Sequence, residues 1–306
     1  MLFFEIFVMP VFNRFSCLFL PLRPIIGALL AAFLALTLAG CSSVKLGYQN
    51  APGLGYWWLD SYLDFNDAQS LQVRTELAAL QAWHRQTELP LYVSALDQLQ
   101  RLAPTNVNAE QVCALIDDLR PRLQVLLDRV EPAITALAPT LTAAQFEHLA
   151  RQFDKRSLKW RDEWLAGTAE ERQRRRLKRL IARAEDFYGR LDNVQLAVLH
   201  TSVANSVFDA SLGYRESQRR YRDTLQTLRQ LQGTNANAQA QVHAWLARNL
   251  RSPDLDYQNY VERLNQENCT TLAELHNSTS AAQRRHLADT LKDYASDARA
   301  LIAPQR

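Results

Sequence analysis

Glycine is scarce in this sequence, at 9 of 306 residues. That scarcity disfavours an all-β sandwich, which needs many tight turns, and a nucleotide-binding fold with a glycine-rich loop. A surplus of one charge is also missing, because 35 Lys and Arg residues stand against 32 Asp and Glu residues. This balance argues against a dedicated polyanion binder, and we expect no nucleic-acid partner.

Recognisable catalytic and metal-binding motifs are missing as well. The six histidines show neither His-Glu-x-x-His nor His-x-His spacing, and neither Gly-x-Ser-x-Gly nor Cys-x-x-Cys occurs. His84 and Glu88, four residues apart, would supply only half of a metal site, and we expect a hydrogen bond between them on a helix surface. The sequence therefore predicts no metal, no cofactor and no enzyme.

An enzyme with an unrecognised site remains an alternative. Asp60 and Asp64 lie one helical turn apart and could do acid–base chemistry, although two solvated carboxylates are the simpler interpretation. A pocket that gathers His84 with Asp60 or Asp64 would favour this alternative.

The first forty residues predict a secretion signal. Residues 25–39 form an almost unbroken apolar run, which is shorter than the roughly 20 residues that a membrane-spanning helix needs. The run ends in Leu38-Ala39-Gly40-Cys41, two small residues before a cysteine, which is typical of a bacterial lipobox. We expect a signal peptide over 1–40, starting at Met1 or Met9, and lipidation of Cys41. The alternative is an ordinary membrane anchor with an incidental cysteine.

The predicted lipid anchor also predicts the compartment in which the protein is located. Several acyl chains on Cys41 would hold the protein on a membrane permanently. Since no Asp follows Cys41, we expect the outer membrane, with the protein facing the periplasm. That compartment is oxidising, so the two remaining cysteines, Cys113 and Cys269, predict a disulfide. The alternative is two separately buried thiols.

The rest of the chain reads as helices. Apolar residues recur at spacings of three and four, for example Leu287, Leu291, Tyr294, Ala298 and Leu301, and no alternating β pattern is evident. We predict an all-α fold, a multi-helix bundle or short helical solenoid with essentially no sheet. A lipid-anchored linker is expected over 41–53 and a single domain over 54–306. The expected helices are 54–64, 67–88, 90–103, 108–138 (interrupted near Pro121 and Pro132), 142–166, 168–189, 192–231, 236–250, 254–277 and 280–302.

One helix-start pattern recurs five times. A capping residue is followed three positions later by Gln, which is typical of a capping box. The five pairs are Asn66 and Gln69, Asn108 and Gln111, Thr142 and Gln145, Asp192 and Gln195, and Ser280 and Gln283. Each cap contributes on the order of 1 kcal/mol and fixes where a helix begins.

A basic run is the first candidate binding surface. Its seven cations are Arg172, Arg174, Arg175, Arg176, Lys178, Arg179 and Arg183, and a second cluster follows at Arg215, Arg219, Arg220 and Arg222. Such a face could bind lipid phosphates or an acidic protein partner. The alternative is a solvated face neutralised by Glu170, Glu171, Glu185 and Asp186.

Aromatic residues cluster soon after Cys41. They are Tyr48, Tyr56, Trp57, Trp58, Tyr62 and Phe65. Tyr and Trp suit a membrane interface, but packing against the helical body is the interpretation we prefer.

Several segments resemble an uncharacterised family of proteobacterial lipoproteins, defined as a domain of unknown function. The matching residues are the lipobox, Tyr48, Asn50, Trp57, Trp58, Asp60, Tyr62, Asp64, and the segments 82–90, 170–177 and 282–287. The resemblance implies a helical envelope lipoprotein and supplies no activity and no catalytic residues. Leu141-Thr142-Ala143-Ala144-Gln145 also resembles, more locally, a Leu-Thr-x-x-Gln motif of Spy-type periplasmic chaperones.

Together these observations predict a non-enzymatic outer-membrane lipoprotein. Its helical body is expected to bind an envelope protein partner or client, as a scaffold or chaperone-like module, through the basic run. The alternative is a lipid- or envelope-glycan-binding module that uses the same cations.

Overall fold

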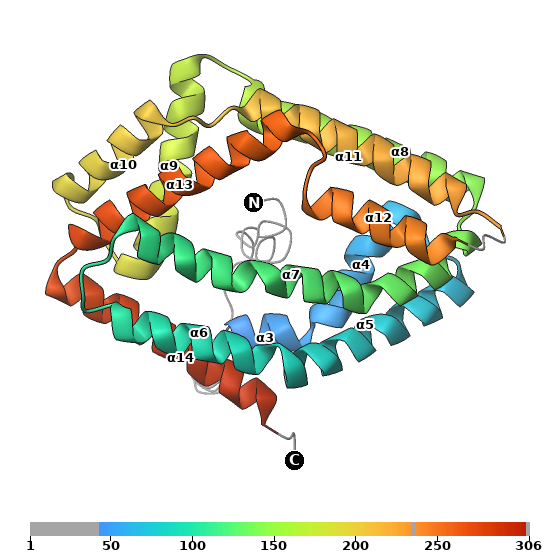
Figure 1. The fold of residues 1–306 in the computed structure, drawn as a ribbon, viewed down its shortest axis with the longest axis horizontal. Helices are drawn as coiled ribbons and strands as arrows, with labels where there is room; N and C mark the ends of the chain where they lie inside the picture. Colours follow the sequence, from blue (N-terminus) through green and yellow to red (C-terminus); the bar gives the residue numbers. More distant parts are fainter. Residues whose placement is uncertain (1–42, 234–236, 304–306) are drawn as a thin grey trace, which may run out of the picture. The chain divides into compact units, whose positions relative to one another are not determined.

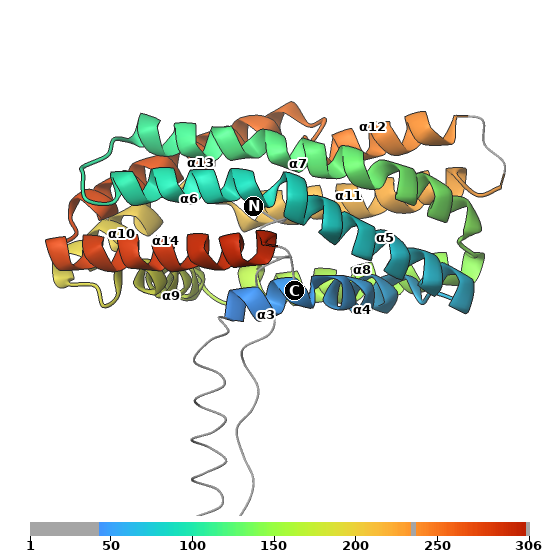
Figure 2. The same cartoon turned by 90° about the horizontal axis from the view of Figure 1, so that it is seen from below.

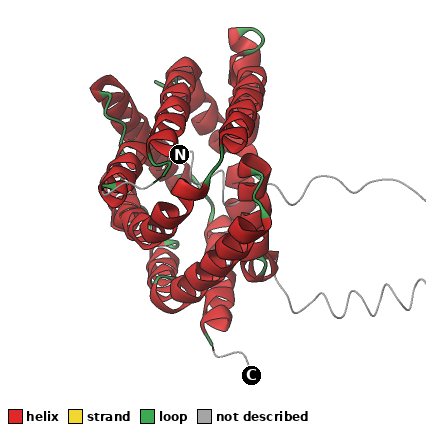
Figure 3. Ribbon diagram, turned by 90° about the vertical axis from the view of Figure 1, so that its right-hand side faces the viewer, coloured by secondary structure: helices red, strands yellow, loops and turns green. Residues whose placement is uncertain are grey.

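The all-α prediction is confirmed in the part of the chain that the structure describes. This computed structural model describes residues 43–233 and 237–303, in which helices are joined by loops and no strand occurs (Figure 3). None of the helices in these ranges combines the length and apolarity needed to cross a membrane. The predicted signal peptide and Cys41 lie outside the described residues.

Twelve α-helices and two short helical turns make up the described ranges. They are α3 (Ser43–Gln49), α4 (Ala51–Leu63), α5 (Asp67–Thr87), α6 (Leu89–Leu102), α7 (Ala109–Leu137), the 3₁₀ turn η1 (Ala138–Thr140), α8 (Ala143–Trp160), the π-helical turn η2 (Arg161–Leu165), α9 (Ala169–Tyr188), α10 (Asn193–Asn205), α11 (Ala210–Gln230), α12 (Ala238–Leu250), α13 (Leu255–Asn277) and α14 (Ala281–Ile302).

Helix α7 is the longest helix of the described ranges, and residues 44–306 form one compact unit. Helices α12 and α13 pack along α7 one after the other, and α6 packs beside α14 (Figures 1 and 2). Helix α8 packs beside α11, and α4 packs on α5 and α8.

The buried apolar side chains form four clusters. The largest joins α7, α8, α11 and α12 around Phe146, Leu231 and Val242. A second joins α9, α10 and α13 around Leu199. Smaller clusters join α6 to α14 and α7 to α13. The fold is thus held by several local cores.

All five predicted helix starts form capping boxes. In each, the cap side chain accepts from the backbone N–H of the third helical residue, and the Gln side chain accepts from the backbone N–H of the cap. A sixth box, Thr168 with Glu171, begins α9. These boxes satisfy N–H groups that a helix start otherwise leaves without partners.

Four of the capping glutamines also join helices in pairs. Gln69 and Gln145 donate to each other's side-chain oxygen at 3.3 and 2.7 Å, linking the starts of α5 and α8. Gln195 and Gln283 do the same at 2.7 and 2.8 Å, linking α10 and α14. One glutamine thus serves both as a cap and as a tertiary contact, because its carbonyl oxygen accepts twice while its amide donates.

Some predicted boundaries are wrong. The single helix expected over 192–231 is two helices, because Asp209 caps a new start by accepting from the N–H of Ser211 at 2.7 Å. Conversely, α7 runs uninterrupted through Pro121 and Pro132. Helix begins at Ser43, so most of the expected linker is helical, and the helix expected over 142–166 ends in the π-helical turn η2. At these positions tertiary packing outweighs the helix-breaking and helix-forming preferences of the local sequence.

Cys113 and Cys269 are joined in a disulfide between α7 and α13. Their Cα atoms are 5.5 Å apart and their positions differ by 156 residues. Cys269 is 1% exposed and packs with Val112 and Ala273. The bridge fastens an early helix to a late one.

His276 is held as a neutral imidazole between α9 and the loop before α7. Its Nε2 lies 2.8 Å from the carbonyl oxygen of Thr105, so Nε2 carries the proton and donates. Its Nδ1 lies 3.0 Å from the Tyr188 hydroxyl and accepts from it. Burial lowers the pKa of His276 below 6.5 and raises the pKa of Tyr188 to about 12. Protonating Nδ1 would remove the acceptor that Tyr188 uses.

We therefore expect the free energy of unfolding to fall as the pH drops from about 7 to 5. The folded state has the lower His276 pKa, so the unfolded chain binds the proton first, and the stabilisation present above pH 6.5 is lost below it. Burial also lowers the pKa of His84, which acts in the same direction. Urea unfolding at several pH values measures this. The variant His276→Gln should flatten the profile, whereas the exposed-site control His200→Gln should not.

Candidate functional site

The basic run lies on α9 and meets the turn between α8 and α9. Arg172 donates to the carbonyl oxygen of Gly167 at 2.7 Å, and Arg175 donates to those of Glu163, at 3.2 Å, and Ala166. These carbonyls belong to the end of η2 and the loop after it, where no continuing helix can supply donors. Both arginines therefore act as caps for the end of the preceding helix.

Three more cations of the run lie over aromatic rings. Arg176 is 4.1 Å from the centre of the Phe208 ring, Arg179 is 4.2 Å from that of Trp164, and Arg183 is 5.0 Å from that of Phe187. All three also have a polar partner. Arg176 donates to the Ser206 hydroxyl at 2.9 Å, and Arg179 pairs with the Glu163 carboxylate at 3.5 Å. Arg183 pairs with Asp186 at 3.7 Å.

Burial lowers the pKa of Arg176, which lies between α9 and the connection from α10 to α11. Cation–π contacts and hydrogen bonds of this kind fix the position of a helix. Five of the seven predicted binding cations are thus used by the fold itself.

Arg174 and Lys178 are the two cations of the run that remain exposed without an ion pair or hydrogen bond among the described residues. Arg174 is still close enough to contribute to lowering the pKa of Glu170, after the larger effect of the hydrogen bond from Thr168. Both border a shallow hollow of about 340 Å³. The hollow's other lining residues are Leu177, Ile181, Ala182 and Glu185. We call this surface the α9 hollow.

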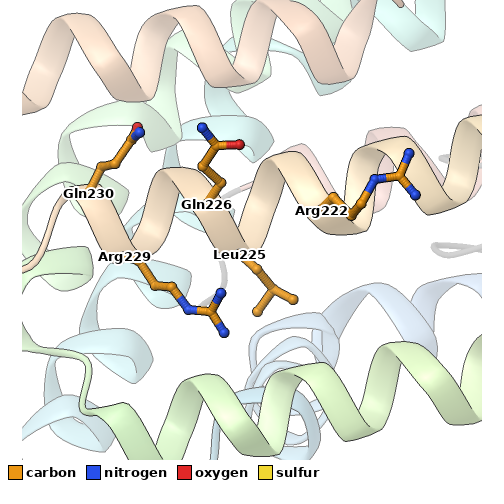
Figure 4. A pocket seen from close by; sticks show the side chains of 5 residues that line it. All are labelled: Arg222, Leu225, Gln226, Arg229 and Gln230. Atoms are coloured by element: carbon orange, nitrogen blue, oxygen red, sulfur yellow. The ribbon is translucent and has the colours of Figure 1, made fainter.

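A second hollow, of about 510 Å³, lies on α11. Figure 4 shows its lining, with Arg222 and Arg229 on either side of Leu225, together with Gln226 and Gln230. As in the α9 hollow, two cations on one helix border apolar surface, here that of Leu225. The two surfaces share a chemistry that fits an acidic, partly apolar segment.

Arg219 and Arg220 of the second predicted basic cluster are neutralised, whereas Arg215 is exposed. Arg219 and Arg220 bond the buried Glu216 at 2.8 and 2.7 Å, and Arg219 also approaches Asp223 at 3.5 Å. Burial raises the pKa of Glu216, but the hydrogen bonds from the two arginines outweigh it and hold that pKa below its usual value. This cluster therefore packs α11 onto its surroundings.

His84 and Asp60, two residues of the possible catalytic site, make their hydrogen bonds to different partners. His84 Nδ1 is 3.0 Å from the Tyr48 hydroxyl, and its ring stacks on Tyr92, so the expected bond to Glu88 is wrong. Glu88 is buried and reaches Arg122 at 3.5 Å, while its other oxygen is buried without a partner in the described part. Asp60 accepts from the backbone N–H of Phe65 at 3.0 Å and closes the turn after α4.

A cluster that sequence reasoning missed joins α7 to α12. Asp128, Glu131 and His243 hold ligand-type atoms within 4.8 Å of one another. Glu131 lies 2.8 Å from His243 Nδ1, and Gln124 donates to Asp128 at 2.7 Å. The spacing along the chain gives no signal, because His243 lies more than a hundred residues from the two acids. The Glu131–His243 contact already partners both groups, so we assign the cluster to helix packing.

The aromatic stretch after residue 43 divides between two environments. Tyr56, Tyr62 and Phe65 pack on the body as expected: Tyr62 lies 6.2 Å from Phe153 and Tyr56 lies 6.2 Å from Phe65, between ring centres. Trp57 does not follow the packing prediction, since it is 66% exposed, and Trp58 is 37% exposed although its ring centre lies 4.9 Å from that of Tyr62. Tyr56 therefore faces α5, whereas Trp57, one residue further along, faces outward.

Comparison with known proteins gives a family but no activity. No curated protein and no solved structure matches the chain. One family model matches residues 61–254, a range that includes the α9 and α11 hollows and excludes α3, most of α4, and all of α13 and α14. Because that model matches more than half of the chain, the protein belongs to the family of unknown function DUF6279.

Proposed function

We propose that this protein is a non-enzymatic lipoprotein of the outer membrane, anchored through acylated Cys41 and facing the periplasm. The lipobox Leu38-Ala39-Gly40-Cys41 and the apolar run before it support the anchor. The helical body then acts as a protein-binding module for an envelope partner or client.

The α9 hollow is the observation that carries the binding proposal. Arg174 and Lys178 have no ion pair of their own in the described residues, whereas the other cations of the run hold the fold. An acidic segment with an apolar side would place carboxylates on these two cations and apolar side chains over Leu177 and Ile181. Glu185, at the far end of the hollow, would favour a cation in the partner at that position.

We expect Arg174→Glu combined with Lys178→Glu to reduce recovery of the partner several-fold. Each exposed ion pair contributes roughly 0.2–1 kcal/mol, and reversing the charges adds repulsion to the loss. Crosslinking in intact cells, followed by affinity purification and mass spectrometry, measures the recovery. The matched control reverses two exposed arginines elsewhere, Arg215→Glu with Arg263→Glu.

The outcome separates the hypotheses. One dominant partner lost only in the α9 variant supports a scaffold role, and a broad set of unfolded outer-membrane proteins supports a chaperone-like role. Equal recovery from both variants would remove the α9 hollow from the proposal. Recovery of lipid alone, detected in the same eluate, would favour the lipid- or glycan-binding module.

A further inference from the structure

One face of α4 is apolar, aromatic and exposed. Leu54, Trp57 and Trp58 follow helical spacing, and Ser61 lies one turn further along the same face. Trp57 is among the most exposed large apolar side chains of the described residues, and Leu54 and Trp58 are exposed as well. On the preceding helix α3, Val44 and Leu46 are also exposed.

The opposite face of α4 is firmly held, so this exposure belongs to an ordered helix. The Tyr56 hydroxyl bonds Ser70 at 2.9 Å, and the Arg74 guanidinium lies 3.5 Å from the centre of the Tyr56 ring. His148 Nε2 lies 3.0 Å from the carbonyl oxygen of Ser61. The Tyr56 contacts with α5 fix which side of α4 faces outward, and His148 of α8 holds the backbone near the end of the helix.

No ionisable side chain interrupts the exposed face. Its members are Gly53, Leu54, Trp57, Trp58 and Ser61. Asp60, the nearest carboxylate, is directed to the backbone of Phe65. Trp side chains combine an apolar ring with an N–H donor, which suits the headgroup level of a bilayer.

We propose that this face of α4 docks on the phospholipid surface to which Cys41 is tethered. The proposal rests on the proposed lipid anchor, because Ser43 begins α3 only two residues after Cys41. Two residues span at most about 7 Å, so acyl chains on Cys41 would hold α3 at the bilayer surface. The body would then meet the membrane through α4, and the α9 hollow would serve a separate partner.

Brominated lipids test this contact with the full chain. The purified protein is added to vesicles of phosphatidylethanolamine and phosphatidylglycerol whose acyl chains carry bromine, which quenches nearby tryptophan emission. We expect quenching that is lost when Trp57→Phe and Trp58→Phe are combined. The control Trp245→Phe should leave it intact, because the Trp245 indole donates to Thr224 within the body at 3.2 Å. Leu54→Glu with Trp57→Glu should weaken the remaining quenching of Trp58, with helicity unchanged in circular dichroism.

Two further measurements keep the proposals apart. The mass of the N-terminal peptide reports acyl chains on Cys41 independently of quenching. Acylated Cys41 without quenching of Trp57 and Trp58 would overturn the docking face and support the lipid anchor. Quenching of these tryptophans without acylation of Cys41 would overturn the anchor and support the docking face. A dimer that Trp57→Glu dissociates, with no quenching by the vesicles, would assign the face to a second copy and overturn the proposal.

Discussion

Removing the Cys113–Cys269 disulfide is expected to lower the free energy of unfolding by about 2–5 kcal/mol. The bridge closes a loop of more than 150 residues, and the entropy that a crosslink removes from the unfolded chain grows with loop length. The helices it joins, α7 and α13, share only a small apolar cluster around Val112, Cys269 and Ala273. Few other apolar contacts at this point would compensate for its loss.

Urea unfolding of the oxidised protein and of Cys113→Ser with Cys269→Ala measures the effect. Reductant should shift the wild-type midpoint toward that of the variant and leave the variant itself unchanged. The variant also controls for Cys17 and Cys41, since any effect of reductant through those residues would persist in it. Identical midpoints with and without reductant would instead support two separate thiols.

Local capping chemistry is what the sequence predicted best. A capping box spans four residues, so its partners are visible in the sequence without tertiary information. All five predicted boxes formed. The box at Thr168 went unrecognised because its third helical residue is Glu171, whereas the pattern followed in the sequence ended in Gln.

Helix breaks and continuations depended on packing that the sequence does not display. The connection between α10 and α11 contains neither Pro nor Gly. It is stabilised by Glu267, which accepts from the N–H of Val207 at 2.8 Å, and by Arg176 over Phe208. Both partners come from other helices. In α7, packing against α12 and α13 keeps the helix continuous through two prolines.

The sequence predicted the cations of the candidate site but not their partners, because those partners also depend on tertiary packing. Spacing on α9 identified seven cations, but not which of them would meet the carbonyls after η2 or the rings of Trp164 and Phe208. Those partners are set by how α8, α9 and α11 meet. Only then do Arg174 and Lys178 stand out as available for a partner.

The variant Gln195→Ala is expected to cost about 2–3 kcal/mol of the free energy of unfolding. Gln195 is fully buried, accepts from the Asp192 N–H at 3.0 Å, exchanges two hydrogen bonds with Gln283 and donates to the Ser278 carbonyl at 3.2 Å. Truncation removes one partner each from the Asp192 N–H and the half-buried Ser278 carbonyl and two hydrogen bonds from Gln283, which keeps its bonds to Arg190 and Ser280. A polar group that loses its partner in a buried position costs about 1–3 kcal/mol.

Gln111→Ala is the matched control, because Gln111 occupies the same capping position but is exposed, and within the described part of the chain its side chain accepts only from the Asn108 N–H, at 2.9 Å. Its loss should cost no more than about 1 kcal/mol. Urea unfolding of Gln195→Ala, Gln283→Ala and the double variant then isolates the pair: the second substitution should cost less in the presence of the first, because its partner is already gone. Equal costs for Gln195→Ala and Gln111→Ala would mean that Gln195 stabilises the start of α10 alone. A larger cost for Gln195→Ala, together with coupling to Gln283, would mean that the same glutamine that begins α10 also holds α14 in place.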